Sequence, residues 1–365
     1  MSAFWKKARP LILLFFSLIL CASSTLLFIR APKLWIWGLK IFATEWSWIF
    51  LLVAILIAIL ANEKTLTSRL SRAAAIIAAI AYLIPVIQAV RVMERYGVHL
   101  KFDELFQHKV LFQNIAFGAQ GQHIDFYPSS MRGKAPCVII IHGGGWRGGN
   151  TQELSALNSI LSKNGYAVAS VSYRLSPGAS WPAAYDDVVA ALTYLRANAE
   201  KFNIDPDQLV VLGRSAGGQL AADIAVKKSV PGICGCICFY APLDMVFGYG
   251  IARENDILHS PRLLRDYLGG TPKSAPKAYH DASPYFFIAH DTVPFLLVHG
   301  TRDDLVWVRH SERFADRLKE NGVSYHMVTL PWSTHAFDFP PLGFGRIIST
   351  SVVLDFLHEV CKFDR

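Results

Sequence analysis

Cysteine is scarce in this sequence, whose 365 residues include only six. So few cysteines do not form a disulfide scaffold in a chain of this length, which excludes the class of small, disulfide-stapled domains. Three of them alternate with other residues in CGCIC (234–238), whereas tetrahedral zinc sites usually follow C-x₂₋₄-C spacing. Cysteine at every second position of an apolar segment is typical of one face of a buried strand. We therefore predict core residues here and no metal site.

Acidic residues are few in the first part of the chain. Residues 1–110 contain 13 Lys and Arg but only 5 Asp and Glu, whereas residues 111–365 contain 23 of each class. The net charge of +8 therefore belongs to the first part. The basic residues flank apolar stretches and form no run with interleaved aromatics, which argues against nucleic acid as a partner and favours the headgroups of membrane lipids.

Internal repeats and low-complexity tracts are also missing, whereas apolar residues are abundant. Hydrophobic residues make up 52% of the chain and the mean hydropathy is +0.30, which is high for an ordinary soluble protein. Three apolar stretches approach the length of about 20 residues that a membrane-crossing helix needs. They lie at 11–29, 41–61 and 73–90. The second is uncharged from residue 46 onward, and it extends back to 41 if Glu45 lies at the membrane interface. We predict about three transmembrane helices in a membrane-anchoring region, 1–110.

The first apolar stretch has an alternative interpretation as a cleaved signal peptide, because Lys6, Lys7 and Arg9 precede it. It is longer than the usual apolar region of 7–15 residues and has no small-x-small exit, which favours a retained anchor of a multi-pass membrane protein. The cations are spread evenly over the flanks, so the side of the membrane on which residues 111–365 lie is undecided. An aromatic belt at the membrane surface is predicted by Trp35, Trp37, Trp46 and Trp48.

Short β-branched runs alternate with amphipathic stretches from about residue 111 to the end. This alternation predicts βαβ units and a mostly parallel sheet with helices on both faces. The predicted strands are 137–141, 166–173, 208–213, 233–240, 294–300 and 324–330, after an antiparallel strand at 123–128. The predicted helices are 151–163, 183–201, 215–228, 308–321 and 345–361. Residues 241–293 are too long for a plain βα connection, and we predict a cap-like insertion there, with a purely structural excursion as the alternative.

The segment GRSAGG (213–218) follows the apolar run LVVL and precedes QLAADIAV. A G-x-S-x-G pattern between a strand and a helix predicts a nucleophile elbow, which here projects the Oγ atom of Ser215 above the sheet. A serine nucleophile needs a base to take its proton, and the base needs a carboxylate to orient it. In the expected chain order these are Asp303, after the strand in LLVHGTRDDLV, and His335, after the last strand in LPWSTHAFDF.

Other residues compete for the roles of acid and base. Asp304 is an alternative acid one residue further from the strand end. His310 and His326 also follow Asp303, but one lies in a predicted helix and the other in a predicted strand. The position after the final strand favours His335 as the base.

The segment IHGGGWRGG (141–149) contains five glycines directly after a predicted strand. Phosphate-binding loops are an alternative, but the segment has neither G-x-x-x-x-G-K-[ST] nor G-x-G-x-x-G spacing. Glycine allows the main chain to approach a ligand closely, and backbone amides stabilise the oxyanion of an acyl-transfer reaction. We therefore predict an oxyanion hole formed by the amides of Gly144, Gly145 and Ala216.

These motifs occur together with SYRLSPGASWPAAYDDVVAALTYL and a late THAF. Over about residues 120 to 360 the chain resembles the α/β-hydrolases of the hormone-sensitive-lipase and carboxylesterase kind, especially their bacterial esterase/lipase and prenylcysteine methylesterase-like branch. The resemblance implies an α/β-hydrolase fold and a catalytic triad of Ser215, Asp303 and His335. Asp186 and Asp187 match a position that is structural in such proteins. Lipase-like members often have an acidic residue in place of Arg214, so their acyl preferences do not transfer.

The sequence thus predicts a membrane-anchored serine carboxylic ester hydrolase, which acts on a small-molecule or lipid-like ester and needs no cofactor. Two alternatives differ from it in function. An acyltransferase would use the same triad but transfer the acyl group to an alcohol or lipid. A non-catalytic membrane protein on a hydrolase fold would have a broken triad, whereas this triad is intact in the sequence.

Overall fold

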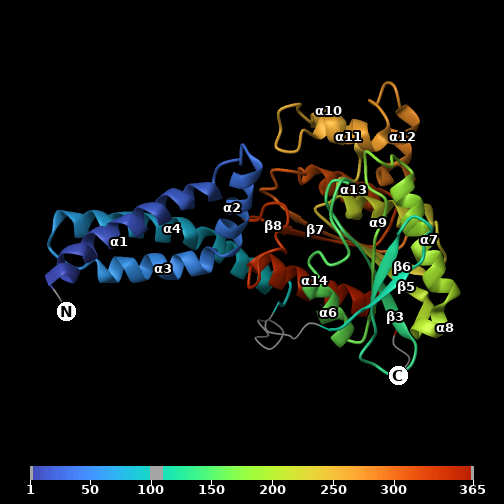
Figure 1. Ribbon diagram of the computed structural model, residues 1–365, viewed down its shortest axis with the longest axis horizontal. Helices are drawn as coiled ribbons and strands as arrows, with labels where there is room; N and C mark the ends of the chain where they lie inside the picture. The colour runs from blue at the N-terminus through green and yellow to red at the C-terminus, as the bar shows by residue number, and fades with distance from the viewer. Residues whose placement is uncertain (1–2, 99–109, 363–365) are drawn as a thin grey trace. The chain divides into compact units, whose positions relative to one another are not determined.

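The computed structural model describes residues 3–98 and 110–362 (Figure 1). The chain divides into two compact units. The first unit comprises Met1–His99, Gly300–Asp304 and Leu330–Ile348, and the second comprises the rest of the chain. The domain border predicted near residue 110 adjoins residues 99–109, which lie outside the described residues.

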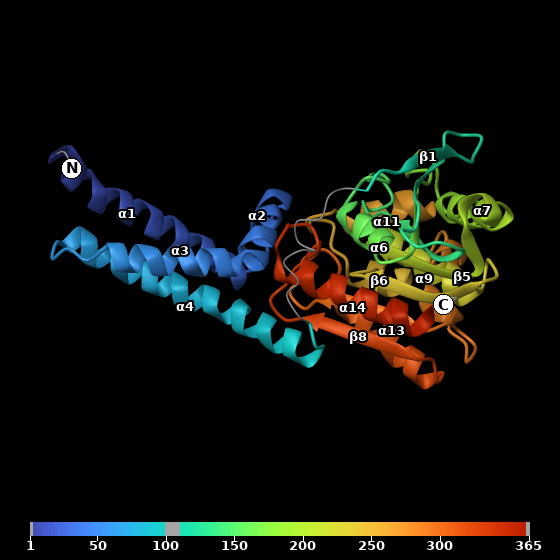
Figure 2. The ribbon, with the colours of Figure 1, turned by 90° about the horizontal axis from the view of Figure 1, so that it is seen from below.

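The helices of the first unit are α1 (Ala3–Ser24), the short turn η1 (Thr25–Leu27), α2 (Leu34–Glu45), α3 (Ser47–Leu60) and α4 (Leu66–Arg95). Helices α1, α3 and α4 lie side by side in both views (Figures 1 and 2). Small residues such as Ala54, Ala75 and Ala78 are fully buried where these helices pack, and they allow close approach of the helix backbones. The hydroxyl groups of Ser23 and Tyr82 join α1 to α4 through a hydrogen bond of 2.7 Å.

Two helices in the described part of the chain are long and apolar enough to cross a membrane, within Ala8–Leu27 and Leu66–Arg95. The predicted stretch 41–61 is not one helix, because α2 and α3 meet at a bend of 74°. With 14 residues, α3 alone is shorter than the roughly 20 residues a span needs, so a third span exists only if the bent pair crosses together. Large apolar side chains are exposed on these helices, among them Leu11, Phe15, Ile59 and Ile80.

The second unit is built on an eight-stranded sheet in the order β1-β2-β4-β3-β5-β6-β7-β8. The strands are β1 (Gln113–Ala116), β2 (His123–Tyr127), β3 (Ala135–Ile141), β4 (Ala167–Val171), β5 (Ile204–Arg214), β6 (Ile233–Phe239), β7 (Phe295–Gly300) and β8 (Tyr325–Leu330). Strand β2 pairs antiparallel with β1 and β4, whereas the pairs β4–β3, β3–β5, β5–β6 and β6–β7 are parallel. The predicted strands are confirmed, and β1 is an additional short strand at the edge.

The connecting helices are α6 (Ala156–Lys163), α7 (Ala183–Ala197), α8 (Ala199–Phe202), α9 (Ala216–Lys227), α13 (Arg309–Glu320) and α14 (Phe344–Val360). They confirm the predicted helices with two differences: residues 151–155 form turns, and the stretch 183–201 is split at Asn198. Strand β6 shows how helices cover both faces of the sheet. The Sγ atom of Cys238 lies 3.4 Å from the Gly218 carbonyl oxygen of α9, whereas a Cβ atom on Gly235 would lie 3.1 Å from Phe356 of α14.

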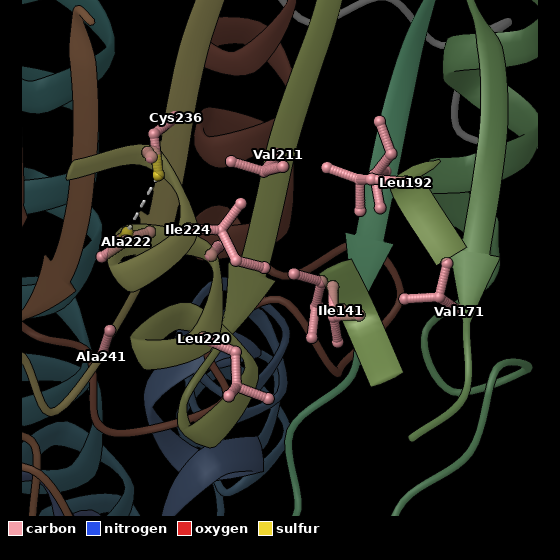
Figure 3. Packing of buried hydrophobic residues seen from close by; sticks show 14 of the residues in the cluster. Ile141, Val171, Leu192, Val211, Leu220, Ala222, Ile224, Cys236 and Ala241 are labelled. Atoms are coloured by element: carbon pink, nitrogen blue, oxygen red, sulfur yellow. Dashed lines mark hydrogen bonds between the residues drawn. The ribbon is translucent and has the colours of Figure 1, made fainter. Parts of the chain in front are cut away.

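Two of the three cysteines of β6 lie in the core as the strand spacing predicts, whereas Cys234 is only partly buried. Cys236 and Cys238 are fully buried, and their sulfur atoms are 3.7 Å apart. Figure 3 shows Cys236 in the same apolar layer as Val211 of β5 and Ile224 of α9. The helix that begins after Ser215 is therefore packed on the middle of the sheet.

A carboxyl group of α9 is also buried in this layer. Asp223 is fully buried and pairs with Lys227 at 2.9 Å. The Nζ atom of Lys227 lies 4.6 Å from the ring centroid of Phe287 and 5.1 Å from the ring centroids of Trp181 and Tyr185. Burial raises the pKa of Asp223 to about 7, above the value of about 3.9 that an aspartate has in an unfolded chain.

This shift predicts how the stability depends on pH. Between about pH 4 and pH 7 the folded protein binds more protons at Asp223 than the unfolded chain does, so the free energy of unfolding falls as the pH rises through this window. We expect the Asp223→Asn variant to lose less stability than the wild type between pH 5 and pH 8, measured as the thermal unfolding midpoint in detergent. The exposed Asp316→Asn is the matched control, and an equal fall in all three proteins would contradict the prediction.

Candidate active site

Ser215 lies on the turn between β5 and α9, with φ 51° and ψ −120°. Positive φ in a residue other than glycine is a strained conformation, and it is the geometry expected of a nucleophile elbow. The amide of Ser215 donates to the carbonyl oxygen of Phe239 at 2.9 Å, and the amides of Gly218 and Gln219 donate to the Ser215 carbonyl oxygen at 2.9 and 3.2 Å. Because of this φ, α9 begins after Ser215, one residue later than predicted.

Two glycines of the GRSAGG segment are required by the packing of this turn. A Cβ atom on Gly213 would lie 2.0 Å from the carbonyl oxygen of Gly217, and a Cβ atom on Gly217 would lie 2.2 Å from the carbonyl oxygen of Ile141. Real Cβ atoms do not approach oxygen so closely, so only glycine fits at either position. The G-x-S-x-G spacing therefore has a direct steric cause, in a contact within the elbow at Gly213 and a contact with β3 at Gly217.

The glycine loop, residues 142–149, follows β3 and passes beside the elbow. A Cβ atom on Gly143 would lie 3.4 Å from the Cβ atom of Ser215. Gly144 and Gly145 have φ values of 106° and 60°, a region that favours glycine. In the part of the chain that the structure describes, the amides of Gly144 and Gly145 donate no hydrogen bond. They are main-chain donors in the loop whose Gly143 lies beside the serine.

His142, the histidine of the glycine loop, carries no charge near neutral pH. His142 is buried, and its ring stacks on Tyr173 at a centroid distance of 4.2 Å. Burial lowers the pKa of His142 to about 4. Its Nδ1 atom lies 2.8 Å from the carbonyl oxygen of Gly143, so the neutral ring donates to the loop backbone and holds its conformation.

The insertion 241–293 packs on the glycine loop. Its helices are α10 (Met245–Ile251), α11 (Ser260–Leu268), α12 (Pro276–Asp281) and the short η2 (Pro284–Phe287). Trp146 of the loop stacks on Tyr267 of α11, with ring centroids 4.2 Å apart. The Nε1 atom of Trp146 and the hydroxyl group of Tyr267 both donate to the Oε1 atom of Gln219 in α9, at 3.0 and 3.2 Å. One glutamine thus joins the glycine loop, the insertion and the nucleophile helix.

The first unit contains the two segments that carry Asp303 and His335. The Nδ1 atom of His335 lies 2.7 Å from the Oδ2 atom of Asp303, and the two side chains are 7% and 0% exposed. The amide of Arg302 donates to the carbonyl oxygen of Ser333 at 3.0 Å, which ties the two segments together. A carboxylate bonded to Nδ1 fixes the imidazole tautomer with hydrogen on Nδ1 and leaves Nε2 as the basic nitrogen.

The alternative acid has a different partner. The Oδ2 atom of Asp304 accepts a hydrogen bond from the Nζ atom of Lys40 at 2.6 Å and one from the amide of Ala31 at 3.2 Å. Both members of the Lys40–Asp304 pair are buried. Of the two adjacent aspartates, Asp303 is the one that contacts His335.

The two alternative histidines lie in other surroundings. His326 on β8 is half exposed and pairs with Glu359 at 2.8 Å. His310 in α13 is buried, and its ring meets Phe247 edge-on at a centroid distance of 5.1 Å. The segment after the last strand carries His335 alone of the three.

The acidic pair at the start of α7 has the structural surroundings that the resemblance implies. Asp187 accepts hydrogen bonds from the amide and the Nε atom of Arg174, both at 2.8 Å, and from Gln122 at 3.0 Å. These contacts join α7 to the segments that follow β4 and precede β2. Asp187 therefore stabilises the packing of the second unit.

Two charged residues near the Asp303–His335 pair were not anticipated from the sequence. Lys40 and Glu45 lie on α2, and both are buried in the first unit. Glu45 is the only acidic residue before position 63, which marks it as unusual in an apolar stretch. Its hydrogen-bond partners lie about 300 positions later in the chain, so the sequence does not indicate them. Among the described residues, no group of three or more His, Cys, Asp or Glu side chains is arranged to hold a metal ion.

Comparison with known proteins identifies the family. A family model named BD-FAE matches residues 124–318, more than half of the chain. The chain belongs to the BD-FAE family. The BD-FAE match begins in β2 and ends in α13, so it includes the elbow, the glycine loop and Asp303.

The relatives of this BD-FAE protein are of the kind predicted. It is 31% identical over 271 residues to the probable carboxylic ester hydrolase LipM of Mycobacterium tuberculosis, an alignment that covers 68% of this chain and 61% of LipM. It is 26% identical over 242 residues to the probable isoprenylcysteine alpha-carbonyl methylesterase ICMEL1 of Arabidopsis thaliana, covering 61% of this chain and 50% of ICMEL1. The chain thus spans about half to three fifths of the length of these curated relatives.

The fold of the BD-FAE protein is also shared with solved structures. The carboxylesterase EstE1, cloned from a metagenomic library, superposes with a TM-score of 0.60 at 23% identity, covering 76% of this chain and 98% of EstE1. The predicted α/β-hydrolase fold, preceded by two to three apolar helices, is confirmed.

Proposed function

We propose that this protein is a membrane-anchored serine carboxylic ester hydrolase with Ser215, His335 and Asp303 as its triad. The observation that carries the proposal is the buried hydrogen bond of 2.7 Å between Asp303 and His335. The strained turn at Ser215 supports the same chemistry, as do the amides of Gly144 and Gly145, which donate no hydrogen bond within residues 3–98 and 110–362.

In the proposed reaction, the Oγ atom of Ser215 attacks the ester carbonyl carbon while Nε2 of His335 takes the hydroxyl proton. Asp303 holds the ring and stabilises the imidazolium ion that forms. The amides of Gly144, Gly145 and Ala216 donate to the oxyanion of the tetrahedral intermediate. The imidazolium then gives its proton to the leaving alcohol, and water attacks the acyl-enzyme with His335 as base, which releases the acid and restores the serine.

The oxyanion hole is tested by adding one methyl group to the glycine loop. In Gly144→Ala the new Cβ atom would lie 2.3 Å from the carbonyl oxygen of Gly148, at a φ of 106°. The loop must shift, and loss of one oxyanion donor lowers kcat by about 10²- to 10³-fold. We expect a fall of this size with little change in KM for a short-chain ester.

A matched control for this variant is Gly250→Ala in α10, where a Cβ atom meets nothing within 4 Å. It adds the same methyl group to the same protein and is expected to keep wild-type kcat. Wild-type kcat in Gly144→Ala as well would remove the glycine loop from the proposed mechanism.

Membrane anchoring is supported by the length and composition of α1 and α4 and by their exposed apolar side chains. Lipid tails are the surroundings in which such side chains lose no free energy by exposure. We expect the protein to remain with the membrane pellet after alkaline carbonate extraction and to be released by detergent. Release by carbonate alone would contradict anchoring.

The activity is tested by incubating the full-length protein in detergent with esters of increasing acyl chain length. Release of the free acid supports hydrolysis, whereas preferential formation of a new ester with an added alcohol would identify an acyltransferase. Absence of both activities, together with no reaction with a fluorophosphonate probe, would favour a non-catalytic protein and contradict the proposal.

A further inference from the structure

Helix α2 contains two ionic side chains that are buried within the first unit. Lys40 is 2% exposed and Glu45 is 0% exposed. A buried charge is costly unless it is paired and hydrogen-bonded. The sequence around these residues is strongly apolar, so an uncharged residue would pack there without this cost. The contacts that both charges make are therefore informative.

The Lys40 ammonium group holds the segment of Asp303 on both sides. Its Nζ atom donates to the Oδ2 atom of Asp304 at 2.6 Å and to the carbonyl oxygen of Arg302 at 3.4 Å. A third hydrogen bond, of 3.0 Å, goes to the carbonyl oxygen of Ile29, just before α2. Asp303 thus lies between two residues that are fixed by the same lysine.

The Glu45 carboxylate holds the segment of His335 on both sides. One oxygen accepts a hydrogen bond from the hydroxyl group of Ser333, two residues before His335. The other oxygen accepts from the amide of Gly345, in the first turn of α14, at 2.6 Å. A Cβ atom on Gly345 would lie 2.8 Å from this oxygen, so glycine permits the contact. The carboxylate joins the start and the end of the segment that carries the base.

Aromatic residues beside these charges contact the same segment. The Nε1 atoms of Trp46 and Trp48 donate to the carbonyl oxygens of Pro341 and Leu342, at 2.7 and 3.2 Å. The ring of Trp37 lies 6.4 Å from the ring of His335, measured between centroids. Three of the four tryptophans predicted as an aromatic belt therefore contact the segment that follows β8.

We propose that α2 is a positioning element of the active site, in which Lys40 fixes the segment of Asp303 and Glu45 fixes the segment of His335. The inference rests on the proposed esterase function. Lys40 bonds to residues on both sides of Asp303, and Glu45 bonds to residues on both sides of His335. The Asp303–His335 pair therefore keeps its alignment only while both sets of hydrogen bonds are present. Misplacement of a catalytic group by about 1 Å can cost about 100-fold in rate. The N-terminal helices are then part of the catalytic machinery as well as an anchor.

The test uses the full-length protein in detergent with the variants Glu45→Gln and Lys40→Met. Glutamine keeps the size of Glu45 but turns an NH₂ group toward one of two donors, and methionine removes the ammonium group. We expect kcat for a short-chain aryl ester to fall about 10- to 100-fold, as for other residues that orient catalytic groups. KM should stay close to the wild-type value. The rate constant for labelling by a fluorophosphonate should fall in parallel, with one label per chain at completion.

Matched controls are Lys33→Met and Glu94→Gln, which make the same substitutions at exposed charges, one directly before α2 and one in α4. They are expected to keep wild-type kinetics. Ser333→Ala provides a second test of the Glu45 contact if Glu45→Gln does not fold, because it removes one hydrogen bond and little volume. It should lower kcat in the same direction by a smaller factor.

Two results would overturn the inference. One is wild-type kcat in Glu45→Gln, Lys40→Met and Ser333→Ala. The other is a variant in which fewer chains become labelled but those that do react with the wild-type rate constant. The charges would then stabilise the fold without aligning the Asp303–His335 pair. Failure of the proposed function is distinguishable from both, because the wild type itself would then neither hydrolyse esters nor accept the label.

Discussion

Replacement of Ser215 by alanine is expected to lower kcat for ester hydrolysis by about 10⁴- to 10⁶-fold, the range found when the nucleophile of a triad is removed. The variant has no hydroxyl group to form the acyl-enzyme, so only binding and the oxyanion donors remain. Alanine is smaller than serine, so the substitution adds no strain to the turn at φ 51°. The measurement is steady-state hydrolysis of a short-chain aryl ester, with thermal unfolding as the check on folding.

His335→Ala is expected to lower kcat about as much, because the members of a triad act as a unit. For the same reason the double variant should be little worse than either single variant. His310→Ala makes the same substitution at another buried histidine and should keep most of the activity. Persistence of most activity in Ser215→Ala would refute the assignment of the nucleophile.

Asp303→Asn is expected to lower kcat by about 10⁴-fold, the loss seen when the carboxylate of a triad becomes an amide. The amide offers NH₂ or a neutral oxygen to the Nδ1 atom of His335, so the ring loses both its fixed tautomer and the stabilisation of its charged form. The neighbouring Asp304→Asn is the matched comparison. It breaks the pair with Lys40 and should cost about 10- to 100-fold, as expected for a residue that orients the site.

The two variants thus distinguish Asp303, the proposed acid of the triad, from Asp304, which we propose positions it. The measurement is kcat for both variants in the same detergent and at the same pH. A greater loss in Asp304→Asn than in Asp303→Asn would reverse the two roles and contradict the contact of 2.7 Å between Asp303 and His335 as the catalytic one.

The sheet and the elbow are predictable from the sequence because their causes are local. The alternation of apolar runs and amphipathic stretches predicts β3 to β8. The glycines around Ser215 are required by contacts within the elbow and with β3, the neighbouring strand in the sheet. Strand β1 escapes prediction since it has only four residues, mostly exposed, and no apolar pattern.

The order of the proposed triad residues along the chain also comes from the sequence, but tertiary contacts decide which of Asp303 and Asp304 bonds to His335. Lys40 bonds to Asp304, which lies 264 positions later in the sequence, and His335 bonds to Asp303. No local pattern reports such a pairing. The role of Glu45 is hidden for the same reason, because Ser333 lies 288 positions away.

The bend between α2 and α3 shows the limit of hydropathy. The stretch 41–61 is mostly apolar and has no charged residue except Glu45, so composition alone predicts one continuous helix. The carboxylate of Glu45 and the indole of Trp46 instead bond to the segment that follows β8. These contacts accompany the departure from helical geometry at Trp46, with φ −97° and ψ 21°.

The central claim is that one serine of this chain becomes covalently acylated with the help of His335. The most direct measurement is tandem mass spectrometry of the full-length protein after reaction with a fluorophosphonate. The account predicts a single modified residue, Ser215, at one label per chain, and very slow labelling of His335→Ala under the same conditions. Modification of a different residue, or equally fast labelling without His335, would contradict it.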